Sequence, residues 1–255
     1  LLHSALLLSL LPAPLNLAMK ALQIPGADDS APGTLLITTL ALVLATSLLR
    51  SGKLLYLASL WGFLAYGLGW DPVLRALGSS PIQNQALDFL PLLGALAGLA
   101  LWLHRKAGPE FALPVARSTL LLAVGLGFWQ LVPEGGSRPL AATALLLYSV
   151  GFAALAHPFR DWAFLNGSGT HLLAHLATIT LAGALWVIGG DGATASHLAL
   201  MGYSIVVLAL AGTPLPDSAR NALRHVGLAC GPLICLAGPE AAGPGTKGLS
   251  LFVVP

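Results

Sequence analysis

All ten Asp and Glu residues of this chain lie outside its apolar segments, nine in the connectors between them and Glu240 after the last. A soluble core would not need to exclude every acid from nine separate segments, whereas a charged side chain inside a bilayer is costly. Charged residues make up only 9% of the 255 residues, against about 25% in ordinary soluble domains. These features predict an all-α fold, a polytopic transmembrane helical bundle.

Apolar runs bounded by Pro, Gly and charged residues predict nine helices and about eight to nine spans. The first segment contains Pro12 and Pro14, which should kink it, and the ninth contains Pro232 and is the shortest. We expect a transmembrane helical domain over residues 1–238. A Pro/Gly-rich tail follows over residues 239–255 and should end in a short apolar strand or a truncated span. The nine segments are Leu1–Ala18, Thr34–Leu49, Leu54–Trp70, Phe89–Leu103, Ala112–Val132, Leu140–Ala156, Thr170–Ile188, Ser196–Ala211 and His225–Ala237.

Basic residues concentrate in every second connector. The first, third, fifth and seventh connectors hold only Lys20, Arg75 and Arg138. Because cytoplasmic loops carry an excess of Lys and Arg, the even connectors should be cytoplasmic, and so should the N-terminus. We expect a multi-pass protein of a bacterial inner (plasma) membrane. The basic residues in or beside the even connectors are Arg50, Lys53, Arg105, Lys106, Arg117, Arg160, Arg220 and Arg224.

The densest polar chemistry lies around the start of the seventh segment. Asn166, Gly167, Ser168 and Gly169 predict a flexible turn and a helix start, with Thr170 as a candidate N-cap.

His171 and His175 stand four residues apart, so on a helix they share one face. Two imidazoles so placed can bind one metal ion, and His171 and His175 are therefore the candidate metal ligands. The alternative is that both lie near the headgroups and bond to the connector or to water. Zinc sites of this spacing usually add a carboxylate, as in HExxH, and this one has none.

Five histidines map to the predicted cytoplasmic ends of helices: His104, His157, His171, His175 and His225. This layout resembles that of membrane-embedded metal oxygenases of lipids, although the clustered histidine boxes of that family are missing. The resemblance implies a His-metal enzyme that acts on lipid at the cytoplasmic face. Apart from such a metal, the sequence predicts no cofactor.

Glycines four residues apart occur in two segments, at Gly94 and Gly98 and at Gly227 and Gly231. This spacing lets helix backbones approach closely, so we interpret both pairs as helix-packing sites.

The sequence constrains the function of this chain less than it constrains the fold. No acid or basic residue lies at mid-depth, which argues against an ion-coupled transporter. The first hypothesis is therefore a non-catalytic subunit or scaffold of a larger membrane assembly, whose partners are the lipid bilayer and other membrane subunits. The second is a transporter or channel for a neutral or lipid-like solute, with a path beside Thr178, Thr180 and Ser204. Nucleic acid is not an expected partner, because the net charge is only +2 and the basic residues are scattered.

Overall fold

The structure is a computed structural model that describes residues 27–76, 78, 84–131, 137–160, 163–164, 167–189 and 193–236. The predicted first segment, Leu1–Ala18, and the predicted tail, residues 239–255, lie outside the described residues. Apart from one pairing of two-residue strands, the described elements are all helices, so the all-α helical bundle is confirmed. They are α3 (Ala27–Leu49), α4 (Leu54–Ala76), α5 (Gln85–Asp88), α6 (Leu90–Lys106), α7 (Pro109–Trp129), α8 (Arg138–Ala156), α9 (Gly169–Ile188), α10 (Ala193–Leu210) and α11 (Asp217–Leu236).

Five stretches of the described residues are long and apolar enough to cross a membrane, which makes the chain compatible with an integral membrane protein. Two shorter apolar helices, Leu54–Trp70 and Ser196–Leu210, accompany them. The five stretches are Pro32–Leu49, Gln85–Lys106, Pro109–Trp129, Arg138–Ala156 and Thr170–Ile188.

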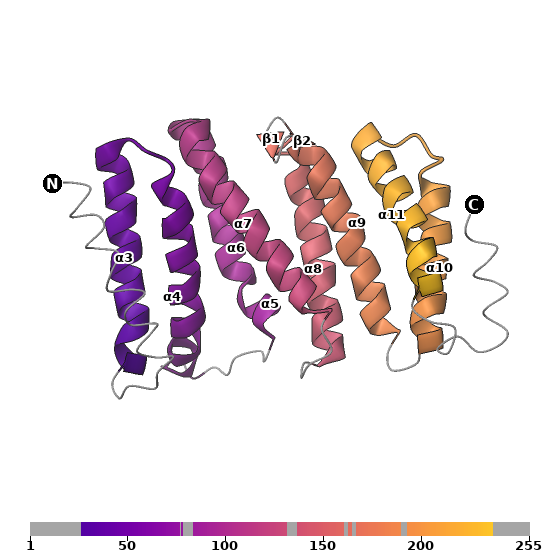
Figure 1. The fold of residues 1–255 in the computed structure, drawn as a ribbon, viewed down its shortest axis with the longest axis horizontal. Coiled ribbons are helices and arrows are strands. Elements are labelled where there is room, and N and C mark those ends of the chain that lie inside the picture. Colours follow the sequence, from indigo (N-terminus) through magenta and orange to yellow (C-terminus); the bar gives the residue numbers. More distant parts are fainter. Residues whose placement is uncertain are drawn as a thin grey trace. The chain divides into compact units, whose positions relative to one another are not determined.

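The chain divides into two compact units, and the boundary falls within α7. We call Leu1–Ala123 the N-terminal unit and Val124–Pro255 the C-terminal unit. In the N-terminal unit, α3 packs along α4 (Figure 1) around Leu35, which is fully buried. Gly62 of α4 faces Thr39 of α3, because a Cβ there would lie in ordinary van der Waals contact, 3.5 Å from the Thr39 methyl group.

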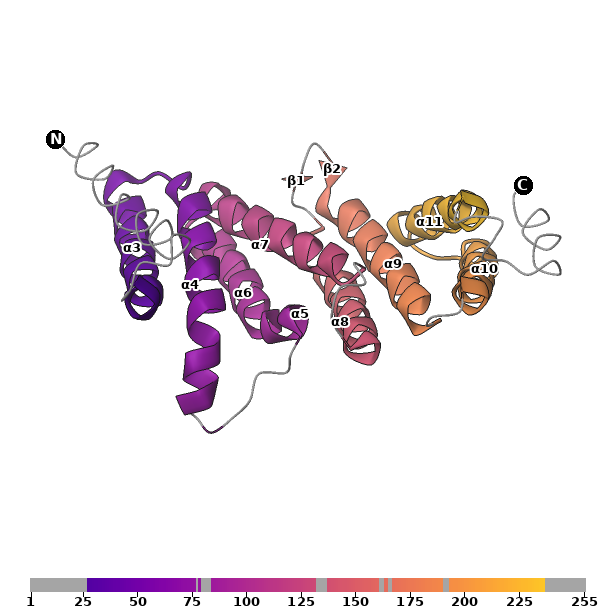
Figure 2. The same ribbon diagram turned by 60° about the horizontal axis from the view of Figure 1, so that its bottom comes forward.

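In the C-terminal unit, α9 packs against α8 on one side and against α10 and α11 on the other (Figure 1, Figure 2). Buried hydroxyls tie these helices together. Tyr203 of α10 donates to the carbonyl of Thr178 at 2.7 Å, as expected for a tyrosine deep in a bundle. The apolar cluster between α9, α10 and α11 contains Ala182, Leu200, Met201, Tyr203, Val207, Val226 and Cys230.

One of the four glycines in the predicted helix-packing pairs, Gly227, packs closely on a neighbouring helix. A Cβ on Gly227 of α11 would lie 2.8 Å from a methyl group of Val207 on α10, so only glycine allows this close approach. The predicted role of Gly227 in helix packing is confirmed, with α10 as the partner.

The structure corrects the predicted start of the ninth segment. α11 begins at Asp217, eight residues before the predicted His225. The apolar run of this helix begins well after its first residue. Asp217 in the first turn stabilises the helix N-terminus, where a negative charge is favourable, and pairs with Arg220 one turn later. The N-cap interpretation of Thr170 also needs correction. Its hydroxyl donates to the carbonyl of Ala156, the last residue of α8, at 3.1 Å.

The alternation of connectors can be followed within each unit. In the N-terminal unit, Gly52 after α3 lies against Glu110 at the start of α7, so the connectors after α3 and α6 share one end. In the C-terminal unit, the connectors after α8 and α10 also share one end (Figure 1). Within each unit, this agrees with the predicted grouping of the basic connectors.

Candidate functional site

Both ring nitrogens of His175, one of the two predicted metal ligands, contact atoms other than the ring of His171. Nδ1 of His175 lies 2.6 Å from the backbone carbonyl oxygen of His171. Nε2 of His175 lies 2.9 Å from Nδ1 of His225, which comes from α11. The structure thus brings His175 together with His225, and His171 contributes its carbonyl.

A metal at His171 and His175 stays a prediction. Within the part of the chain that the structure describes, no group of three or more His, Cys, Asp or Glu side chains could hold a metal ion. The pairing of His175 with His225 was missed by the sequence reasoning, because the two are 50 residues apart. Their shared place at the ends of helices that follow basic connectors was the one available signal.

The hydroxyls predicted to line a solute path donate hydrogen bonds to backbone carbonyls within the C-terminal unit. Thr178 donates to the carbonyl of His175 at 2.9 Å, and Thr180 donates to that of Leu176 at 2.8 Å. Such bonds to the preceding turn are usual for helical threonines. Ser204 instead donates across to the carbonyl of Gly227 at 2.7 Å.

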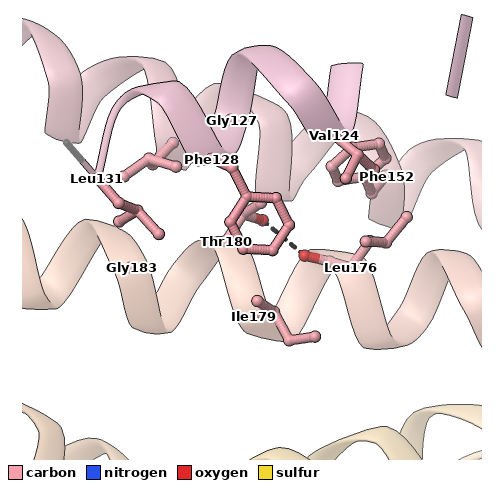
Figure 3. A pocket seen from close by; sticks show the side chains of 10 residues that line it. Val124, Gly127, Phe128, Leu131, Phe152, Leu176, Ile179, Thr180 and Gly183 are labelled. Carbon is pink, nitrogen blue, oxygen red and sulfur yellow. Dashed lines mark hydrogen bonds between the residues drawn. The ribbon is translucent and has the colours of Figure 1, made fainter. Parts of the chain in front are cut away.

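The space beside Thr180 is narrow and apolar. Figure 3 shows the side chains around it, with the Thr180 hydroxyl turned to the Leu176 carbonyl. Its volume is about 20 Å³, close to the minimum of roughly 10–15 Å³ that one water needs. This gap offers no solute path in the structure. It is lined by Val124, Gly127, Phe128, Leu131, Leu145, Phe152, Leu176, Ile179, Thr180 and Gly183.

A much larger cavity lies in the N-terminal unit, between α3, α4 and α6. Its volume is about 590 Å³, within the roughly 300–1,000 Å³ of small-molecule sites. None of its lining residues carries a charge, and most are aliphatic or aromatic. They are Pro32, Gly33, Leu36, Thr39, Val43, Leu55, Ala58, Ser59, Gly62, Phe63, Ala65, Tyr66, Gly69, Trp70, Val73, Leu92, Leu96, Leu99 and Val115.

An aromatic cluster shapes part of this cavity. Tyr66 stacks on Trp70 with ring centroids 4.7 Å apart, and Phe63 packs on Phe89 at 4.4 Å. The Tyr66 hydroxyl donates to the Asp88 carbonyl at 2.8 Å, which ties α4 to the short helix α5.

No family model, curated protein or solved structure matches this chain.

The hydroxyls on the cavity wall are largely turned to the protein. Thr39 donates to the carbonyl of Leu35 at 2.8 Å, and Tyr66 donates to Asp88 as described above. A molecule in the cavity would therefore meet hydrocarbon and aromatic surface, which suits an apolar ligand and disfavours an ion.

Proposed function

We propose that this chain is a multi-pass membrane protein that holds a neutral, lipid-like molecule in the cavity of the N-terminal unit. One observation carries the proposal: a space of about 590 Å³ between α3, α4 and α6 has an uncharged, mainly apolar wall. A lipid-like molecule gains from such a wall because apolar contact replaces water or loosely packed lipid. Carriage of such a molecule across or along the bilayer is the activity that this site would serve.

The test is to purify the protein from native membranes in mild detergent and to extract and identify what remains bound. We expect one neutral lipid-like species at a stoichiometric amount, enriched over its share of the membrane. Recovery of membrane lipids in their bulk proportions would contradict the proposal.

A role as a subunit of a larger assembly is the second candidate, and the second glycine pair favours it. Gly94 and Gly98 of α6 are exposed, and a Cβ on either would meet nothing within 4 Å. This pair differs from Gly227, which packs on α10. An exposed pair at this spacing suits close contact with a helix of another membrane subunit.

Replacing both exposed glycines should remove such a partner and leave the fold intact. We expect the variant Gly94→Leu/Gly98→Leu to lose any stoichiometric protein that co-purifies with the parent chain, because leucine side chains would hold the helices apart. Gly202→Leu is the matched control, since Gly202 is also exposed, helical and without neighbours. Equal partner recovery from both variants would rule out this contact.

We further propose that the basic, even-numbered connectors are cytoplasmic and that the membrane is a bacterial inner membrane. Engineered cysteines test the orientation once native Cys230 and Cys235 are replaced. Gly52 and Gly108 lie in the α3–α4 and α6–α7 connectors but are unsuitable for a cysteine. Gly52 abuts Glu110, and Gly108 has a φ of 101°.

Exposed neighbouring positions serve this test better. Cysteines in the α3–α4, α6–α7 and α10–α11 connectors should react with an impermeant maleimide only from the cytoplasmic side, because these connectors follow the positive-inside rule. Cysteines at the end of α4 and just before α8 should react only from outside. Labelling of Ala76→Cys and Ala107→Cys from one side would refute the topology. The exposed positions are Lys53, Ala107 and Thr213 for the first set and Ala76 and Ser137 for the second.

A further inference from the structure

The contact between His175 and His225 joins two helices near their N-terminal ends. His175 lies in the second turn of α9 and His225 in the third turn of α11, and these helices pack against each other. The ring centroids are 5.2 Å apart and the ring planes are inclined by 29°. His175 is partly exposed and His225 is exposed, so a dissolved ion can reach them.

The bond to the His171 carbonyl defines which nitrogen of His175 carries the proton. A carbonyl oxygen only accepts, so Nδ1–H of His175 donates to it at 2.6 Å. In the neutral ring the lone pair is then on Nε2, which faces His225. Metal-bound histidines usually have this arrangement, with one ring nitrogen bonded to a carbonyl and the other directed at the metal.

The separation of the two facing nitrogens suits a shared cation. With metal–nitrogen bonds of about 2.0–2.1 Å, two nitrogens in adjacent positions of a square or octahedral site are about 2.9 Å apart, and those of a tetrahedral site about 3.4 Å. The observed separation is 2.9 Å. In this geometry Nδ1–H of His225 can donate to Nε2 of His175, and a shared cation would replace that proton when neutral His225 carries its proton on Nε2.

We propose that His175 and His225 together bind one divalent transition-metal ion across α9 and α11. Imidazole ligands suit Zn²⁺, Ni²⁺ and Cu²⁺ better than Mg²⁺ or Ca²⁺. Water completes the coordination. This ligand pair differs from His171 and His175, because His171 orients the ring of His175 through its carbonyl and does not ligate.

The surrounding charges make the site one of moderate affinity. Asp217, the acid at the start of α11, pairs with Arg220 and is two turns away from His225. Arg224, next to His225 in the chain, adds a positive charge. The binding energy therefore comes from the two imidazoles, and loss of either should affect binding strongly.

The experiment measures Zn²⁺ binding to the full chain, purified without a histidine tag, by equilibrium dialysis and elemental analysis. We expect one Zn²⁺ per parent chain. His175→Ala and His225→Ala should each weaken binding by more than about tenfold, since loss of even an outer-shell partner costs about 10–100-fold. His225→Gln repeats the test with a side chain of similar size, and size-exclusion chromatography checks that each variant is folded.

His171→Ala is the matched control, because alanine keeps the backbone carbonyl that His175 uses. It should bind Zn²⁺ within about threefold of the parent chain, less than the loss of a ligand costs. With Cu²⁺ as the probe, electron paramagnetic resonance should show two coupled nitrogens in the parent and one in His225→Ala. The proposal is overturned if the parent binds no stoichiometric Zn²⁺, or if His171→Ala loses binding while His225→Ala keeps it.

Discussion

The variant Leu92→Trp/Leu96→Trp is expected to lose about nine-tenths of the lipid-like molecule that the parent chain retains. Both leucines line the cavity from α6, and two indoles would occupy space that the ligand needs. A tenfold loss corresponds to only about 1.4 kcal/mol of binding free energy, less than forced overpacking commonly costs. The measurement is the amount of bound molecule per mole of purified protein, by quantitative mass spectrometry.

Leu44→Trp/Leu121→Trp is the control for this experiment. These two leucines belong to the same unit, are 65% and 73% exposed, and do not line the cavity. In the control the new tryptophans should face lipid and not the cavity. The amount of bound molecule should therefore equal that of the parent chain. Equal retention by both double variants would place the bound molecule elsewhere, and the cavity would lose its proposed role.

Gly52→Ala is expected to lower the unfolding temperature in detergent by about 5 °C or more. A Cβ on Gly52 would lie 2.0 Å from the carbonyl oxygen of Glu110 and 2.8 Å from its carbonyl carbon. That oxygen also lacks its usual helical partner, because Pro114 four residues later has no N–H to donate. Since both sides of the contact are backbone, neither can move without displacing a helix end.

The size of this effect follows from overpacking, which costs about 1–3 kcal/mol and occasionally more. For a chain of 150–250 residues, each kcal/mol shifts the midpoint by about 2–4 °C. Gly202→Ala is the control, because Gly202 is exposed on α10 and nothing lies within 4 Å of its Cβ position. It should be neutral or slightly stabilising, since alanine favours helix. Similar midpoints for the two variants would show that the turn is not tightly packed against α7.

Helix ends were predicted well where a local signal marks them. The predicted starts or ends at Leu49, Leu54, Ala156 and Ile188 agree with the structure. In each case a polar residue or a helix-breaking Gly or Pro follows or precedes an apolar run within a few residues. Prediction failed at α11, because its first two turns are polar and carry no apolar run.

The candidate sites were predicted less completely, for a physical reason. Periodicity placed His171 and His175 on one helical face, which holds in α9, but it could not indicate that His225 would lie opposite. The cavity wall consists mainly of ordinary apolar residues from α3, α4 and α6, with Val115 from α7, and none of them is unusual in its own segment. A cavity results from how helices are spaced, and single-segment patterns do not contain that spacing.

The sequence by itself determined the helical class, the apolar segments and the exclusion of acids from them, because these depend on properties of neighbouring residues. Only the tertiary structure decided that Gly227 packs on Val207, that His175 meets His225, and that α3, α4 and α6 leave a cavity. Each depends on which helices become neighbours. That choice is made by the sum of many weak contacts between distant segments, so no single stretch of sequence contains it.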